Sequence, residues 1–222
     1  MNMNMNKQKL NLITKSLTRV KKNFYNTDTL TLAKDLLGKY FVRKYNDEFL
    51  IVKIVETEAY HETKDPACHA FNGKTKRNEV MFENPGVLYV YFTYGMHYCM
   101  NIVSEPNGTA GAILLRAGEP ISGLDAMKQL RSQGRSKSDK KHGKRALMVR
   151  DFASGPAKLC QALAITKQEN NHSLLASDIY IAEDKTQEID DDIVQTTRIG
   201  LSKGFELPWR FYLKNSPFIS CK

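Results

Sequence analysis

The chain has 222 residues, of which 41% are hydrophobic and 26% charged, as is ordinary for a globular protein. Its formal net charge is +9. The sequence has no apolar run of about 18 residues that could span a membrane, and no apolar core of a signal peptide at its start. We therefore expect an intracellular protein without a membrane-spanning segment. It would lie in the cytoplasm or nucleoid of a bacterium, or in the nucleus of a eukaryote.

Cysteine usage argues against a zinc site or a disulfide framework, because no two cysteines form a CxxC pair. The acidic run at 190–192 is interpreted as a solvated turn rather than a metal cluster. We therefore expect reduced thiols, no metal and no cofactor. The four cysteines are Cys68, Cys99, Cys160 and Cys221.

Positive charge is concentrated in two segments. Residues 1–22 contain six Lys and Arg and no acid, and residues 134–145 contain six against one Asp. Such clusters suit a polyanion, with nucleic acid the first candidate and an anionic membrane surface the second. A solubilising tail and loop explain them equally well. We expect residues 1–22 to be a basic, disordered tail and residues 23–222 to form one domain.

In chain order, a short helix is predicted after the capping residue Asp28, ending before Gly38. Residues 39–45 and 49–58 then form two strands joined by a tight turn. Residues 61–84 are polar and interrupted by proline and glycine, so we expect a long irregular segment. A loop of this length inside a compact domain is usually functional or disordered.

Residues 85–101, PGVLYVYFTYGMHYCMN, predict a β-hairpin, because apolar and aromatic side chains alternate on either side of one glycine turn. The unusual feature is Tyr94, a large ring at a position where turns commonly carry Asn, Asp or Ser. We infer that this ring leaves the protein surface and enters a partner molecule.

The second half of the chain continues with alternating elements. Residues 112–116 predict a buried strand, and a helix follows over 124–134. A second helix opens at 154–156, with proline in its first turn. Residues 209–213 and 218–220 predict closing strands. One mixed domain containing helices and strands is the simplest interpretation.

The first candidate chemical group follows the strand at 49–55. If the extended conformation continues, Glu56, Glu58 and Tyr60 point to the same side as Leu50, Val52 and Ile54, which is the side that faces the core. Carboxylates seldom lie there without a partner. Either the strand ends and both acids are solvated, or at least one is held in a cleft. The spacing alone favours the first alternative.

Further candidates are single polar residues in the other elements. Arg116 ends a buried strand and needs an anionic partner, for which Glu58 is suitable. A lone loop histidine such as His69 is more often structural than catalytic. Tyr91 and Asn101 would by default be core residues of the hairpin. Together these residues describe a cleft with a carboxylate, a guanidinium, stacking rings and hydrogen-bonding groups.

Several segments resemble one known family in collinear order over roughly residues 25–220: IVETEAY at 54–60, the following His69, the hairpin at 85–101, AILLRAGEP at 112–120, SGPAKLCQALAI at 154–165, and RFYLKNSPFIS at 210–220. They are similar to the alkyladenine, or 3-methyladenine, DNA glycosylases. The resemblance implies an α+β fold in which α-helices surround a curved, mainly antiparallel sheet with a protruding hairpin.

The resemblance also implies the activity. The chain would be a monomeric, monofunctional DNA glycosylase of base excision repair, with double-stranded DNA containing damaged purines as its partner. It would flip 3-methyladenine, 7-methylguanine, hypoxanthine or 1,N6-ethenoadenine out of the duplex and hydrolyse the N-glycosidic bond. Glu58 looks like the carboxylate that activates water, and Arg116 and the backbone of Ile199 look like groups that hold that water.

The remaining family roles concern the base and the duplex. By resemblance, Tyr60 and Tyr91 would sandwich the flipped base, and His69 would close the pocket. Asn101 would reject guanine through its exocyclic amine, and Tyr94 would fill the gap left in the helix.

Two other classes remain open from the sequence. A non-catalytic DNA-damage recognition protein would need the basic segments and Tyr94 but not Glu58. A bifunctional glycosylase and lyase would need a lysine in the pocket, and the matched segments place none there.

Overall fold

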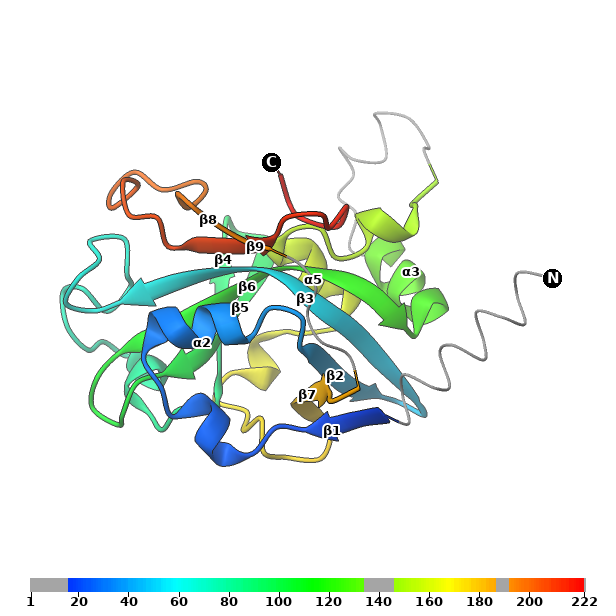
Figure 1. Ribbon diagram of the computed structural model, residues 1–222, viewed down its shortest axis with the longest axis horizontal. Helices are drawn as coiled ribbons and strands as arrows, with labels where there is room; N and C mark the ends of the chain where they lie inside the picture. The colour runs from blue at the N-terminus through cyan, green and yellow to red at the C-terminus, as the bar shows by residue number, and fades with distance from the viewer. Residues whose placement is uncertain (1–15, 134–145, 187–191, 222) are drawn as a thin grey trace.

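The computed structural model describes residues 16–133, 146–186 and 192–221 (Figure 1). The chain forms an α+β fold with a twisted, mainly antiparallel sheet, as predicted. The predicted basic loop at 134–145 and most of the acidic run lie outside the described residues. So do residues 1–15 of the predicted tail, whereas Leu17–Arg19 form a strand and belong to the sheet.

Nine strands make one sheet within the described residues, and every pairing between them is antiparallel. Along the main path the strand order is β1-β7-β2-β3-β6-β5-β4, while β9 pairs with both β3 and β8. The strands are β1 (Leu17–Arg19), β2 (Tyr40–Tyr45), β3 (Glu48–His61), β4 (Leu88–Thr93), β5 (His97–Ser104), β6 (Gly111–Ser122), β7 (Ile179–Asp184), β8 (Ile193–Thr196) and β9 (Arg210–Leu213).

Three α-helices and four short 3-10 helices accompany this sheet in the described ranges. Asp28 caps α2, as predicted, by accepting hydrogen bonds from the backbone N–H groups of Leu30 and Thr31. Pro156 begins α5 in the position where its missing N–H is not needed. The helices are η1 (Lys22–Tyr25), α2 (Thr29–Asp35), η2 (Glu79–Phe82), α3 (Leu124–Gln133), η3 (Val149–Asp151), α5 (Pro156–Ala162) and η4 (Lys167–Glu169).

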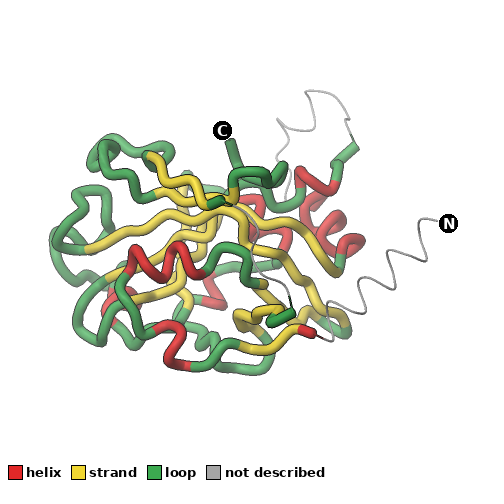
Figure 2. The backbone as a smooth tube through the Cα atoms, viewed as in Figure 1, coloured by secondary structure: helices red, strands yellow, loops and turns green. Residues whose placement is uncertain are grey.

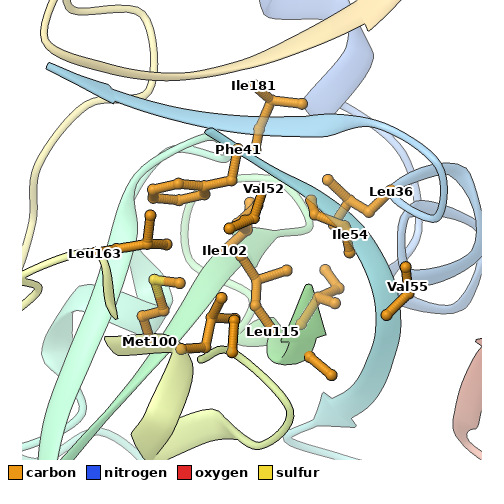
Figure 3. Packing of buried hydrophobic residues seen from close by; sticks show 14 of the residues in the cluster. Leu36, Phe41, Val52, Ile54, Val55, Met100, Ile102, Leu115, Leu163 and Ile181 are labelled. Carbon is orange, nitrogen blue, oxygen red and sulfur yellow. The ribbon is translucent and has the colours of Figure 1, made fainter. Parts of the chain in front are cut away.

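The larger hydrophobic core lies between one face of the sheet and helices α2 and α5. Leu36 from the end of α2 and Leu163 from the end of α5 pack with Met100 and Leu115 of the central strands (Figure 3). All four side chains are at most 1% exposed. This core covers one face of β3, β5 and β6. The opposite face of the same strands is not part of it.

That opposite face is covered by irregular chain rather than by an α-helix. Residues 62–87 contain only the short helix η2, which agrees with the predicted irregular segment (Figure 2). Cys68, Val80 and Met81 of this segment pack against Tyr89 in a second, smaller cluster. The candidate site lies on this second face.

Several elements differ from their predicted extents. Residues 218–220 form turns rather than a closing strand, and Ser220 instead donates hydrogen bonds to a buried carboxylate. The strand predicted at 112–116 runs from Gly111 to Ser122, and β1, β7 and β8 were not predicted. Among the described residues no helix has the length and apolar character to cross a membrane.

Candidate active site

A β-bulge decides which face carries the acidic residues of β3. The register between β3 and β6 shifts by one residue between Ile54 and Glu56, so Val55 is an extra residue in β3. Beyond it the side chains change faces, and Glu56, Glu58 and Tyr60 lie opposite the larger core. The prediction that these residues follow the core-facing parity of Leu50 to Ile54 is therefore wrong. The strand also continues to His61, and both carboxylates are fully buried rather than solvated.

Strand pairing brings distant residues into one row on the second face. Glu58 lies opposite Leu114 of β6, Leu114 opposite Asn101 of β5, and Asn101 opposite Tyr89 of β4. Directly paired residues share a face of a sheet. The predicted candidates Glu58 and Asn101, from two separate segments, thus lie in one row.

Glu58 forms one ion pair and accepts two hydrogen bonds. Arg116 Nη1 lies 3.2 Å from Glu58 Oε1, which confirms the predicted pairing. The backbone N–H of Ile199 donates to the same oxygen at 2.9 Å, and the Tyr60 hydroxyl donates to Oε2 at 2.7 Å. Burial disfavours the charged guanidinium of Arg116, but Glu58 and Glu56 outweigh it, so the pKa of Arg116 is raised. The site therefore holds a carboxylate and a permanent cation in direct contact.

A pocket opens beside this carboxylate, with about 400 Å³ of empty space that includes part of the open solvent. Four predicted base-binding residues line it, whereas Glu58 and Arg116 are not in its lining. Tyr60 lines the pocket and bonds Glu58 through its hydroxyl, which places the carboxylate directly behind the pocket wall. The lining residues are Tyr60, Ala67, His69, Met81, Tyr89, Tyr91, Asn101, Ala112 and Leu201.

The pocket wall on the hairpin side is aromatic. The rings of Tyr89 and Tyr91 stack with centroids 5.5 Å apart, and His69 lies edge-on to Tyr91 at 4.6 Å. His69 Nδ1 is 2.9 Å from the Tyr89 hydroxyl. Burial, with the nearby charge of Arg77, lowers the pKa of His69, so the ring is neutral at pH 7. Burial also raises the pKa of Tyr89 to about 12. Tyr89, to which the sequence analysis assigned no role, belongs to the pocket.

Asn101 is fixed rather than free to rotate. Its side chain is 4% exposed, and Nδ2 donates to the backbone carbonyl of Tyr89 at 3.0 Å. The amide nitrogen is therefore held by the backbone of β4. The other end is the group that a bound molecule would meet.

The tip of the β4–β5 hairpin carries an exposed ring. Tyr94 is 82% exposed and has a φ of 52°, followed by Gly95 at 65°. Two positive φ values are typical of the turns that favour Asn-Gly, and a left-handed conformation costs an ordinary residue about 1–2 kcal/mol. Phe92 and Met96 beside it are 50% and 60% exposed. A ring in this position does not contribute to folding through burial, which suits the predicted contact with a partner.

A buried ion pair that sequence reasoning missed joins two loops at the pocket. Arg198 Nη2 donates to Asp65 at 2.6 Å and to the carbonyl of Gly204 at 2.9 Å, while Nη1 donates to the carbonyl of Ala59 at 2.9 Å. Both charged side chains are fully buried. The guanidinium also lies over the Tyr60 ring, 4.6 Å from its centroid. The loops that follow β3 and β8 lie at the same end of the molecule (Figure 1).

Comparisons with known proteins agree on one family. Residues 23–217 match the family described as methylpurine-DNA glycosylase. Three bacterial relatives carry the provisional name 3-methyladenine DNA glycosylase. The protein of Carboxydothermus hydrogenoformans is 52% identical over 201 residues, covering 90% of this chain and 98% of its own. That of Francisella tularensis is 49% identical over 198 residues, covering 87% and 94%. That of Clostridium perfringens is 43% identical over 209 residues, covering 92% and 100%.

Proposed function

The chain belongs to the methylpurine-DNA glycosylase family and is a DNA glycosylase, and from this premise we propose that it removes alkylated or deaminated purines from duplex DNA as a monomeric, monofunctional enzyme. The proposed substrates are 3-methyladenine, 7-methylguanine, hypoxanthine and 1,N6-ethenoadenine. The observation that supports this proposal best is a buried carboxylate, Glu58, which two hydrogen bonds and an ion pair hold directly behind an aromatic pocket.

Base flipping follows from the position of the reacting bond. A purine inside a stacked duplex does not expose its glycosidic bond to a protein, so it must be extruded at a cost of a few kcal/mol. Aromatic side chains recover about 1–3 kcal/mol per stacked base. Tyr60, Tyr91 and His69 offer such faces in the pocket. Alkylated purines are cationic or electron-poor, which strengthens their attraction to tyrosine rings.

The reaction requires a base for water and stabilisation of a positive sugar. The water oxygen forms a bond to the sugar C1′ and the C1′–N bond breaks, with its electron pair leaving on the purine. We assign to Glu58 the uptake of the water proton and the stabilisation of the oxocarbenium-like sugar. Arg116 and the N–H of Ile199 hold that carboxylate in its orientation. The Tyr60 hydroxyl ties a stacking ring to the same carboxylate.

Asn101 is the proposed discriminating residue. Because its amide nitrogen is held by the Tyr89 carbonyl, it cannot turn away from a purine in the pocket. We propose that the exocyclic amine of guanine clashes there, a penalty that 7-methylguanine, which has the same amine, offsets through the stronger stacking of its cationic ring. A fixed polar group rejects the wrong ligand better than a mobile one does, since leaving it unpaired is costly.

The proposed activity is tested by incubating the protein with duplexes that each carry one damaged purine. We expect release of the free base and an abasic site whose strand breaks only after alkali treatment. No covalent complex should be trapped with borohydride, because a monofunctional enzyme forms no Schiff base. Absence of release from every duplex would refute the proposal, and a trapped complex would assign the enzyme to the lyase class.

Replacing Tyr94 with Ser should slow base release from duplex DNA by roughly 5- to 150-fold, which corresponds to about 1–3 kcal/mol of lost stacking. The reason is that the ring no longer fills the vacancy left by the flipped base. The measurement is the single-turnover release rate. The thermal unfolding midpoint should not fall, since the side chain is 82% exposed.

The Tyr94→Phe protein is the matched control, because it keeps the ring and loses only the hydroxyl. Its release rate should stay close to that of the wild type. Equal rates for the Ser, Phe and wild-type proteins would exclude an intercalating role for Tyr94.

A further inference from the structure

Glu56 is a second buried carboxylate on the same face as Glu58, and it does not line the pocket. Its Oε1 accepts from Arg116 Nε at 3.1 Å, from Arg210 Nε at 2.7 Å and from the Ser220 hydroxyl at 2.9 Å. Its Oε2 accepts from the backbone N–H of Ser220 at 2.6 Å. Glu56 therefore receives more donors than Glu58, although nothing in the proposed reaction uses it.

Arg116 connects the two carboxylates. Its Nε bonds Glu56, its Nη2 lies 3.3 Å from the Ser220 hydroxyl, and its Nη1 lies 3.2 Å from Glu58. A guanidinium is planar and rigid. Holding two of its nitrogens therefore sets the direction in which the third one points. The third nitrogen is the one that contacts Glu58.

We infer that Glu56, together with Ser220, is a positioning residue that aims the Arg116 guanidinium at Glu58. The inference deepens the proposed function and rests on it. It also gives a role to the C-terminal segment, which reaches the site from far along the sequence. Arg210 joins the same cluster, because it bonds both Glu56 and the backbone carbonyl of Cys221.

Two carboxylates, Glu56 and Glu58, face two guanidinium groups, Arg116 and Arg210, in this buried cluster. Glu56 is the partner that both arginines share. Removing its charge leaves Arg116 with Glu58 as its single carboxylate partner.

The test is the Glu56→Gln protein. Glutamine keeps the shape of Glu56 and one acceptor oxygen. Its NH₂ group, however, takes the place of the carboxylate oxygen that accepts from the Ser220 N–H. We expect the single-turnover release rate per folded molecule to fall about tenfold. Affinity for a duplex with a stable abasic-site analogue should change less than threefold. A fall in rate at nearly unchanged affinity separates a positioning role from a loss of recognition.

Glu169→Gln is the matched control. Glu169 is also a buried carboxylate in an ion pair, 2.8 Å from Arg43, but it lies in η4 and outside the pocket. The Glu169→Gln protein should lose stability without a change in the release rate per folded molecule. A shared structural penalty would therefore appear in both variants, and a positioning role only in Glu56→Gln.

Ser220→Ala provides a second route if Glu56→Gln folds poorly. It removes the hydroxyl that contacts both Glu56 and Arg116 and changes no charge. The release rate should fall about threefold. This inference alone would be overturned if the wild type is active, Glu58→Gln is inactive, and both Glu56→Gln and Ser220→Ala release the base at the wild-type rate. An inactive wild type would overturn the proposed function instead.

Discussion

Replacing Glu58 with Gln is expected to reduce base release by about 10²- to 10⁴-fold, the usual contribution of a positioned general base. Glutamine has nearly the same shape and can still accept from Ile199 and Arg116, so the pocket geometry should persist. What it lacks is a basic oxygen that takes the water proton. The measurement is single-turnover release of 1,N6-ethenoadenine from a duplex, with strand breaks produced by alkali.

Binding distinguishes loss of chemistry from loss of recognition. Affinity of the Glu58→Gln protein for the same duplex should match the wild type, because the aromatic wall of the pocket and the hairpin tip are unchanged. Base release at an undiminished rate would remove Glu58 from the mechanism. A non-catalytic damage-binding protein, the alternative that the sequence left open, would show no release in either form.

Local signals predicted the elements whose structure depends on neighbouring residues. The cap at Asp28 and the proline at the start of α5 are decided within one helical turn. The β4–β5 hairpin follows from alternation and a single turn. The partner of Arg116 was also predictable, because a buried guanidinium requires an anion and Glu58 ends the other apolar strand.

The face on which Glu58 lies was not predictable from alternation. Side-chain parity holds only along an uninterrupted strand, and the extra residue Val55 reverses it. That bulge is set by pairing with β6, about sixty residues later in the chain. The short strands β1, β7 and β8 were missed for a related reason, since strand formation depends on the neighbours that a segment meets.

Tyr89 and the ion pair between Asp65 and Arg198 show two further limits of prediction from the sequence. Tyr89 shares its face with Tyr91, and this parity was a usable signal that sequence reasoning did not take up. Asp65 and Arg198 gave no such signal, because charged residues in polar loops are solvated by default. Their partnership arises only when the fold brings two distant loops to the same end of the sheet.

The Asp65→Asn protein should lose about 3–5 kcal/mol in free energy of unfolding, because Arg198 then stays buried without its counter-charge. Arg198 also holds the carbonyls of Ala59 and Gly204, so the loss affects both loops at the pocket. The measurement is urea denaturation, with stability taken from the midpoint and slope. Because Ile199 follows Arg198 and donates to Glu58, release activity should fall as well.

Asp192→Asn is the appropriate comparison, since it makes the same substitution in an exposed pair. Asp192 lies 3.1 Å from Lys214, with side-chain exposures of 78% and 58%. Exposed pairs contribute about 0–1 kcal/mol, because water screens both partners and the side chains lose entropy when they associate. Similar losses in the two variants would mean that the buried pair does not hold the loops together. A large loss in Asp65→Asn alone would show that the pocket depends on an interaction that only the folded chain creates.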